Sequence, residues 1–228
     1  MPVKPPDDSA WPGAESYLEA IYVLTTENRP VQSARIAEYL GVSAVSVSRA
    51  LGRLEKGGDI TERMPEVRLS DQGWRRAEAV LRRHRLAERW LADSLGLGLV
   101  EAHREAERLE HALSSRVEEA LWEDLGRPTT CPHGNPIPGL PGAMAPSLAV
   151  VPLDQAQMGR YVVDRICEQM EGLEERLRWI EEAGLIPGAV FEVRVPSSLA
   201  NGQVVVSFAE QPPISVPLEV ARQLMVRE

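Results

Sequence analysis

A short turn between two helical segments is the feature that most constrains this fold. Apolar residues recur at helical spacing over Val31–Leu40 and again over Ala44–Lys56, and Gly41-Val42-Ser43 separates the two runs. The hydroxyl of Ser43 is placed to accept a backbone N–H from the first turn of the second helix. Two short helices joined by a glycine-containing turn predict a helix-turn-helix.

The flanking residues predict a winged version of this motif. Upstream, residues 15–24 have helical spacing and are followed by Pro30, which stops a helix. Downstream, residues 59–63 and 67–69 alternate like paired strands around a proline-containing turn, which indicates a β-hairpin wing. Residues 1–12 are rich in proline and aspartate, so we expect a mobile arm there.

The rest of the chain divides at its glycines and prolines. We expect one long helix from Ser70-Asp71 to the break at Gly96, and a second from about Glu101 to Leu125. Residues 126–148 are rich in Pro and Gly and lack apolar periodicity, which predicts a linker. Beyond it, a helix and three strand-like runs predict a small barrel. These are Leu173–Glu182, Val190–Val195, Val204–Phe208 and Ile214–Pro217.

Composition limits the classes of protein. The chain has 228 residues, 43% of them hydrophobic, which is enough for more than one core. A net charge of −9 argues against a protein coated with basic residues for bulk nucleic-acid binding. Cys131 and Cys167 are far apart, so neither a disulfide framework nor a structural zinc motif is indicated. Without a signal sequence or an apolar run of about 18 residues, we expect a soluble cytosolic protein.

Three of the four histidines lie in two adjacent predicted helices at spacings that suit a metal site. Residues four, seven and eight positions apart share one helix face, and His84 with Glu88 forms such a pair. The next helix is predicted to carry four more residues on one stripe: His103, Glu107, Glu110 and His111. Imidazoles mixed with carboxylates suit Mn²⁺, Fe²⁺, Co²⁺, Ni²⁺ or Zn²⁺ rather than Cu(I) or Ca²⁺. For either segment alone, a solvated charged face is the simpler interpretation.

The second helix of the helix-turn-helix has the composition of a DNA-reading helix. Its N-terminal half combines short polar side chains with arginines, which can contact bases and phosphates in the major groove. Between Arg29 and Lys56 five basic residues stand against two acidic ones, although the whole chain is acidic. A protein-interaction module is the alternative. The candidate DNA-contacting residues are Ser33, Ser43, Ser46, Ser48, Arg49, Arg53 and Arg63.

The remaining sequence patterns predict no further functional site. Cys131 and His133 are expected to be turn residues of the linker, because no third ligand stands near them in sequence. No Ser/His/Asp triad or phosphate-binding glycine loop is present, and nothing predicts a substrate cleft beside the histidines. We therefore expect no enzyme, with a metalloenzyme as a distant alternative.

Several motifs together resemble the metal-dependent repressors typified by the diphtheria toxin repressor and the manganese transport regulator. The most specific is Gly134-Asn-Pro-Ile-Pro-Gly139, which no generic helix or strand requires. The other matching segments are Tyr17–Tyr22, Arg35–Glu38, Val47-Ser48, His84–Arg89, Glu110-His111 and His133.

This resemblance implies a mainly α protein with small β parts. Its expected domains are a winged helix-turn-helix over residues 1–75, a helical dimerisation and metal-binding domain over 76–147, and an SH3-like β-barrel over 148–228. It implies two metal positions, each completed by residues from another part of the chain. One comprises Glu107, Glu110 and His111 with a first-helix residue, and the other comprises His84, Glu88 and His103 with acids of the SH3-like domain.

The chain departs from the family pattern at two ligand positions. The first-helix ligand aligns to Ser16, a weak ligand, which leaves Glu19 or water to complete the shell. The C-terminal acid is open among Glu171, Glu174 and Glu175. At position 107, iron-responsive members have Cys, whereas manganese-responsive members resemble this chain in having Glu. A carboxylate hardens the site, so Mn²⁺ is the first expectation and Fe²⁺ the second.

The expected function is that of a manganese-responsive homodimeric transcriptional regulator, binding palindromic double-stranded operators of metal-homeostasis genes. The alternatives are an iron-responsive repressor and a metal-independent winged-helix regulator, and Ser16 favours the latter.

Overall fold

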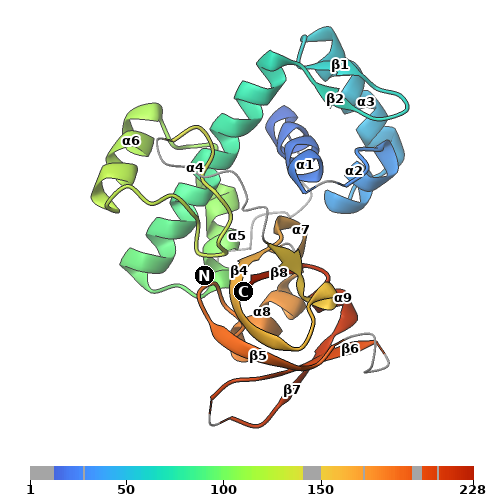
Figure 1. Ribbon diagram of the computed structural model, residues 1–228. Helices are drawn as coiled ribbons and strands as arrows, with labels where there is room; N and C mark the ends of the chain where they lie inside the picture. Colours follow the sequence, from blue (N-terminus) through green and yellow to red (C-terminus); the bar gives the residue numbers. More distant parts are fainter. Residues whose placement is uncertain (1–12, 28, 141–149, 172, 197–201, 210) are drawn as a thin grey trace, which may run out of the picture. The chain divides into compact units, whose positions relative to one another are not determined.

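The computed structural model describes residues 13–27, 29–140, 150–171, 173–196, 202–209 and 211–228 (Figure 1). It contains two compact units, the first ending at Val80 and the second beginning at Leu81. The predicted arm, residues 1–12, and the last part of the predicted linker lie outside the described residues. The exact boundaries of the three expected domains stay a prediction.

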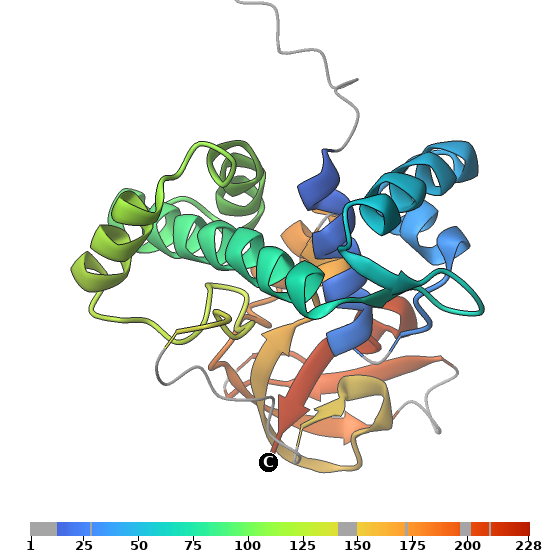
Figure 2. The same ribbon diagram turned by 90° about the horizontal axis from the view of Figure 1, so that it is seen from above.

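The first unit is a winged helix-turn-helix, as the sequence predicted (Figure 2). Ser43 caps the second helix of the motif, its Oγ accepting the backbone N–H of Ser46 at 3.2 Å. Ile60 to Glu62 pairs antiparallel with Arg68 and Leu69 to form the wing. The elements are α1 (Ala14–Thr26), α2 (Ser33–Tyr39), α3 (Ala44–Lys56), β1 (Ile60–Glu62), β2 (Arg68–Leu69) and the first turns of α4 (Asp71–Leu95).

A ring contact and an ion pair are among the interactions that hold the start of α4 within this unit. The ring centroids of Trp74 and Tyr22 lie 4.7 Å apart, so α4 packs against α1. Arg76 pairs with the buried Asp59, which directly precedes the wing. The first turns of α4 are therefore fixed to both the first helix and the wing.

The helical part of the second unit contains the rest of α4, α5 (Leu99–Leu109) and α6 (Ser115–Asp124). Gly96 ends α4 as predicted, with a φ of +70° that glycine adopts without strain. The expectation of one helix from Glu101 to Leu125 is wrong. The chain leaves α5 after Leu109, and Ser114 starts α6 by accepting the backbone N–H of Val117.

The segment over residues 126–140 is a packed loop, so its prediction as part of a linker is wrong. Cys131 and Ile137 are buried, and Thr130 forms a β-bridge with Pro136. Within the loop, the backbone N–H of Cys131 donates to Asn135 O at 2.9 Å. This loop is held by hydrogen bonds and by single buried side chains. Its sequence therefore lacks the regular spacing of apolar residues that marks a helix or a strand.

The last part of the second unit is a small domain around a six-stranded antiparallel sheet in the order β3-β8-β4-β5-β6-β7 (Figure 1). Its strands are β3 (Val151–Pro152), β4 (Gly159–Ile166), β5 (Val190–Val195), β6 (Gln203–Ser207), β7 (Ile214–Pro217) and β8 (Leu224–Arg227). Its short helices are η1 (Leu153–Gln155), α7 (Glu168–Glu171), α8 (Glu174–Glu182) and α9 (Leu218–Ala221).

The small β domain, α8 and the strands β5 to β7 were predicted from the sequence. The strands β3, β4 and β8 were not. A register shift between Val163 and Arg165 interrupts β4. The alternation of buried and exposed residues that marks a strand therefore extends over only a few residues of β4. Two leucines and a valine from α5, α8 and the sheet belong to one buried core: Leu99, Leu177 and Val193.

Candidate metal centre

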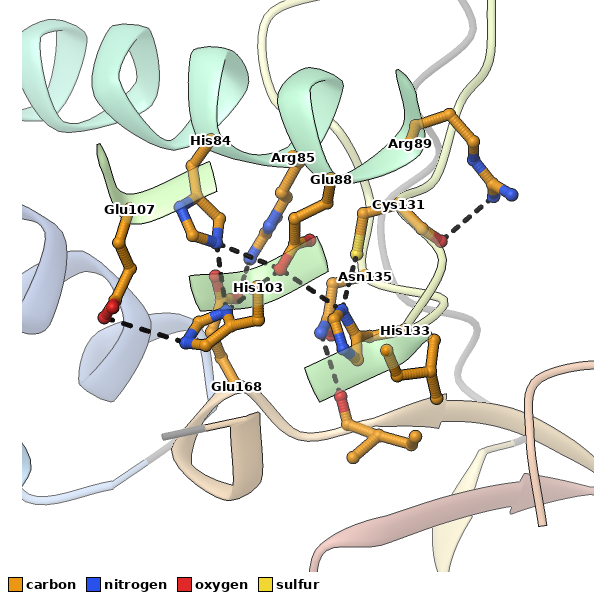
Figure 3. A network of polar contacts seen from close by, with 12 residues as sticks. His84, Arg85, Glu88, Arg89, His103, Glu107, Cys131, His133, Asn135 and Glu168 are labelled. Atoms are coloured by element: carbon orange, nitrogen blue, oxygen red, sulfur yellow. Dashed lines mark hydrogen bonds and ion pairs between the residues drawn. The ribbon is translucent and has the colours of Figure 1, made fainter. Parts of the chain in front are cut away.

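A buried carboxylate on α4 gathers three imidazoles around it (Figure 3). Glu88 Oε1 lies 3.0 Å from His84 Nε2, 3.0 Å from His103 Nδ1 and 3.3 Å from His133 Nδ1. Glu88, His84 and His133 are fully or almost fully buried, and His103 is partly buried. The predicted pair on α4 therefore meets His103 of α5, as the resemblance implied.

Two further residues of this cluster were missed by the sequence interpretation. Cys131 and His133 are buried beside Glu88, and Cys131 Sγ lies 3.9 Å from His133 Nδ1. One ligand-type atom from each of these three residues falls within 4.8 Å of the others. The third partner was absent from the nearby sequence because it comes from α4. We call His84, Glu88, His103, Cys131 and His133 the buried set.

Arginines of α4 hold the loop that carries Cys131 and His133. Arg89 donates to the carbonyl oxygen of Thr130 at 2.9 and 3.1 Å and to that of Cys131 at 3.0 Å. Arg85 donates to the carbonyl oxygen of Pro136. These bonds fix the loop backbone against the helix that carries Glu88.

The other side of the loop is bonded to β4. Asn135 Nδ2 donates to Ile166 O at 2.8 Å, and the backbone N–H of Ile166 donates to His133 O at 2.8 Å. Gly134 has a φ of +86° and lies against Asp164 and Arg165. The Gly-Asn-Pro-Ile-Pro-Gly run thus places His133 by connecting α4 to the small β domain.

Neighbouring charges shift the pKa values of Glu88 and His84 in opposite directions. Burial alone would raise the pKa of Glu88, but His133, His84 and His103 together hold it well below its ordinary value. Burial alone would lower the pKa of His84, but the carboxylates of Glu88 and Glu110 raise it well above its ordinary value. Glu88 is therefore a carboxylate at neutral pH, and His84 carries two N–H groups.

One oxygen of Glu88 fits a cation better than it fits the protein around it. Among the described residues, no donor lies within hydrogen-bond distance of Glu88 Oε2, although this atom is buried. A buried carboxylate oxygen without a donor is costly unless an ion or water satisfies it. Imidazole, carboxylate and thiol groups are also the ligands that first-row transition metals prefer. Both the unsatisfied carboxylate oxygen and the types of ligand in the buried set therefore fit a divalent metal ion.

A second group lies at the C-terminal end of α5, and we call Glu107, Glu110 and His111 the outer set. Glu110 is buried, whereas the side chains of Glu107 and His111 are 62% and 45% exposed. Glu110 Oε1 lies 3.2 Å from His111 Nε2.

The predicted stripe extends only as far as Glu110, which caps α5 in a helical conformation with its backbone N–H donating to Ala106 O, and His111 lies beyond the end of this helix. His103 contacts Glu88 and lies 3.8 Å from Glu107, while Glu110 turns inward. Glu110 Oε2 lies 2.6 Å from His84 Nδ1, so one imidazole contacts both sets.

Glu168 is an acid of the small β domain that contacts α4. It is buried and pairs with Arg85 of α4. Glu174 pairs instead with Arg104 at the surface, and Glu175 is exposed. The side chain of Glu171 lies outside the described residues. Glu168 was missed because a single acid before a short helix carries no spacing signal.

The exposed face of α3 carries most of the candidate DNA-contacting residues. Ser43, Ser48, Arg49 and Arg53 are exposed. Ser46 is buried and its hydroxyl lies 2.7 Å from Ser43 Oγ, so we remove it from the candidate set.

The other two candidate DNA-contacting residues, Ser33 and Arg63, lie outside α3. Ser33 is half-buried at the start of α2. Arg63 of the wing donates to Ser48 O at 3.2 Å and lies 3.4 Å from Glu55, which fixes the wing against α3.

Comparison with known proteins decides the family. The iron-dependent repressor IdeR of Mycobacterium leprae is 36% identical over 224 residues, which are 94% of this chain and 96% of that protein. The chain belongs to the diphtheria toxin repressor family. The diphtheria toxin repressor of Corynebacterium diphtheriae is 40% identical over 151 residues, or 66% of this chain and 65% of that protein. Members of this family are metal-dependent transcriptional repressors, not enzymes.

Solved structures of this repressor family have the same fold. A manganese-dependent transcriptional repressor in complex with manganese is 30% identical with a TM-score of 0.81, over 95% of this chain and 100% of that one. The crystal structure of IdeR from T. acidophilum is 26% identical with a TM-score of 0.76, over 95% of this chain and 98% of that one. These matches confirm the mainly helical fold with its small C-terminal β domain.

Family models divide this repressor into three segments. An N-terminal DNA-binding domain of iron-dependent repressors matches residues 11–61, and a metal-binding and dimerisation domain matches residues 70–139. A FeoA domain matches residues 151–228. Both the buried and the outer set fall within the second segment. No helix in the described ranges is long and apolar enough to cross a membrane.

Proposed function

We propose that the chain is a metal-activated homodimeric repressor that acts in the cytoplasm on roughly palindromic operators of metal-homeostasis genes. The observation that carries this proposal is the buried carboxylate of Glu88 among three imidazoles and a thiol, with one oxygen lacking a donor. Glu88 lies on α4, the same helix whose first turns pack in the winged unit through Trp74. A ligand bound at Glu88 therefore acts on a helix that also belongs to the DNA-reading unit.

The proposed metal ligands are the members of the two sets. In the buried set, the proposed ligand atoms are imidazole nitrogens, the Cys131 sulfur and Glu88 Oε2. In the outer set, Glu110 Oε1 and His111 Nε2 already lie 3.2 Å apart, and Glu107 is on the preceding turn. When bound, the metal supplies positive charge that holds these acidic and imidazole groups together.

Mn²⁺ is the proposed metal of the outer set. Two carboxylates and one imidazole form a hard ligand group, which suits Mn²⁺. Fe²⁺ is the second candidate, favoured by the softer Cys131 and His133 of the buried set and by the iron-dependent repressor that is 36% identical. Selectivity must then come from geometry, because affinity alone favours later metals.

The proposed switch is a shift between conformations. Without metal, Glu107 and Glu110 repel each other at the end of α5, and α4 is held less firmly by the buried set. A bound metal favours the arrangement in which both sets are closed, and only this preference can drive the change. In a homodimer, two reading helices at a fixed separation would match two half-sites about one helical turn of DNA or more apart.

A titration of metals tests this function and chooses between the metals. Mn²⁺, Fe²⁺ under anaerobic conditions and Zn²⁺ are each added to chelator-treated protein, and sequence-selective binding is followed with a pool of random duplexes. We expect Mn²⁺ to support selection at a concentration at or below that of Fe²⁺. If Fe²⁺ alone supports selection, the iron-responsive alternative replaces the manganese proposal.

Metal binding is expected to release protons, and affinity should rise with pH between about 6 and 8. The pKa of His84 is raised well above 6.5, so its Nε2 carries a proton at neutral pH that must leave before this nitrogen can bind a cation. The pKa of Glu88 is lowered, so Glu88 releases none in this range. Calorimetry at pH 7 in buffers of different ionisation enthalpy measures the release. Binding without proton release would show that His84 is not a ligand.

Arg49→Ala is expected to weaken operator binding by about 10- to 100-fold, corresponding to roughly 1–3 kcal/mol, because Arg49 is exposed on the reading helix. Fluorescence anisotropy with the selected operator measures the affinity. Arg104→Ala is the matched control, since Arg104 is half-exposed and lies in the second unit, where it pairs with Glu174. Equal losses for both variants would mean that α3 does not read the DNA.

A further inference from the structure

The helix α5 starts without a side-chain cap of its own. Gly98 is its N-cap residue, and its φ of −67° and ψ of 167° are close to those of Ser43 and Ser114, which cap α3 and α6. Each of these serines accepts a backbone N–H from the first turn of its helix. Glycine offers no side-chain oxygen, so the first N–H groups of α5 depend on a partner from elsewhere.

A carboxylate of α8 takes the place of this missing cap. The backbone N–H of Leu99, the first residue of α5, donates to Glu181 Oε1 at 3.0 Å. A Cβ added to Gly98 would lie 2.8 Å from the same oxygen, so the carboxylate occupies the space of a local capping side chain. A negative charge is also favourable at the N-terminal end of a helix. The cap of α5 therefore comes from the small β domain, 82 residues further along the chain.

This contact at the end of α5 fixes a degree of freedom that its side contacts with α4 leave open. Ala102 and Ala106 of α5 belong to one buried cluster with Ala87 and Leu91 of α4. Alanine side chains form shallow ridges, so they oppose a slide of one helix along the other only weakly. A hydrogen bond to the first residue of α5, by contrast, fixes the position of the helix along its own axis.

We propose that Glu181 is a positioning residue of the buried set, which sets the place of His103 by capping α5. This inference rests on the proposed function, because it assumes that the buried set binds metal. His103 follows the first turn of α5, and its Nδ1 lies 3.0 Å from Glu88 Oε1. Metal ligands must be held within about 0.5 Å of their binding geometry, so a small slide of α5 is enough to weaken the site. Through Glu181, the small β domain acts on a metal ligand without supplying one.

Two variants and one control separate the cap from the charge of Glu181. Glu181→Ala removes the acceptor but keeps Leu99 and Val100, which lie in the buried core of the small β domain. Adding Gly98→Ser to this variant supplies a local capping hydroxyl, and the removed carboxylate leaves room for the new Cβ. Glu182→Ala is the matched control, because Glu182 is exposed on the same helix and carries the same charge.

The position of His103 is measured first, in the metal-free protein. Nuclear magnetic resonance detects its imidazole signals, which are assigned by their loss in His103→Gln. We expect Glu181→Ala to shift these signals, and the added Gly98→Ser to return them to their wild-type positions. Glu182→Ala should leave them unchanged. Signals of His103 that do not move in Glu181→Ala would overturn the inference.

The metal affinity of the buried set is the second readout. Co²⁺ binding is followed by the thiolate charge-transfer band of Cys131, and we expect its affinity to fall about five-fold in Glu181→Ala, as for a lost helix cap. The added Gly98→Ser should restore it to within about two-fold. Equal losses for Glu181→Ala and Glu182→Ala, or no recovery with Gly98→Ser, would overturn the inference.

Failure of the proposed function would look different from failure of this inference. Wild-type protein that binds no Co²⁺ at Cys131 would contradict the buried set as a metal position. The imidazole signals of the metal-free protein would still decide whether Glu181 places His103. Circular dichroism of each variant confirms that it is folded before signals and affinities are compared.

Discussion

Replacing Glu107 and His111 together with alanine is expected to abolish metal-dependent operator binding. The double variant removes two of the three outer-set ligands and leaves only Glu110. We expect Mn²⁺ affinity at this position to fall by at least about 100-fold, as is typical when metal ligands or their partners are lost. Operator affinity at a saturating wild-type Mn²⁺ concentration should then equal that of chelator-treated protein. Anisotropy with the selected operator measures both quantities.

The control for this variant is a pair of exposed acids outside both sets. Glu105 pairs with Arg108 on the surface of α5, and Glu119 is exposed on α6. Glu105→Ala with Glu119→Ala removes two carboxylates, one more than the double variant, but no proposed ligand. If this control lost metal response equally, the effect would reflect general charge and the outer set would not be the switch.

Gly134→Ala is expected to destabilise the second unit by about 3 kcal/mol or more. Gly134 has a φ of +86°, and a Cβ there would overlap the carbonyl oxygen of Asp164 and lie 2.9 Å from Arg165 Cα. Relief of this overlap must push the loop away from β4, which would also displace His133 from Glu88. Urea denaturation measures the stability, and Co²⁺ titration measures the accompanying loss of buried-set affinity.

Gly188→Ala is the matched comparison for this substitution. Gly188 has a φ of +88°, nearly the same as Gly134, but no atom lies within 4 Å of a Cβ added there. Its cost should be that of the backbone conformation alone, about 1 kcal/mol. If the two variants lost similar stability, the close packing of the loop against β4 would not be what holds His133 in place.

The winged helix-turn-helix could be predicted because each of its elements has a local signal. Ser43 marks the start of α3, and Gly96 marks the end of α4 through a positive φ. The end of α5 has no such mark. His111 follows Glu110 in a run that still has helical spacing, and only the cap at Ser114 reveals the interruption. The prediction of one continuous helix from Glu101 to Leu125 failed at this point for that reason.

The buried set could be predicted only in part. His84 and Glu88 are neighbours on one helix, so their spacing points to a shared face. Cys131 and His133 join them through a loop that Arg89 and Asn135 hold by hydrogen bonds to distant residues. Such contacts leave no periodic pattern, and a Pro- and Gly-rich segment reads as a linker. The fold of that loop depends on packing that the local sequence does not encode.

Control of DNA binding by metal is tested by selecting DNA sequences with and without Mn²⁺. The protein is used to select sequences from random duplexes twice, once with saturating Mn²⁺ and once with excess chelator. We predict that Mn²⁺ yields a roughly palindromic sequence bound with high affinity, and that the same duplex is bound only non-specifically in chelator. Selection of the same sequence with the same affinity in both conditions would show that metal does not control DNA binding by this chain.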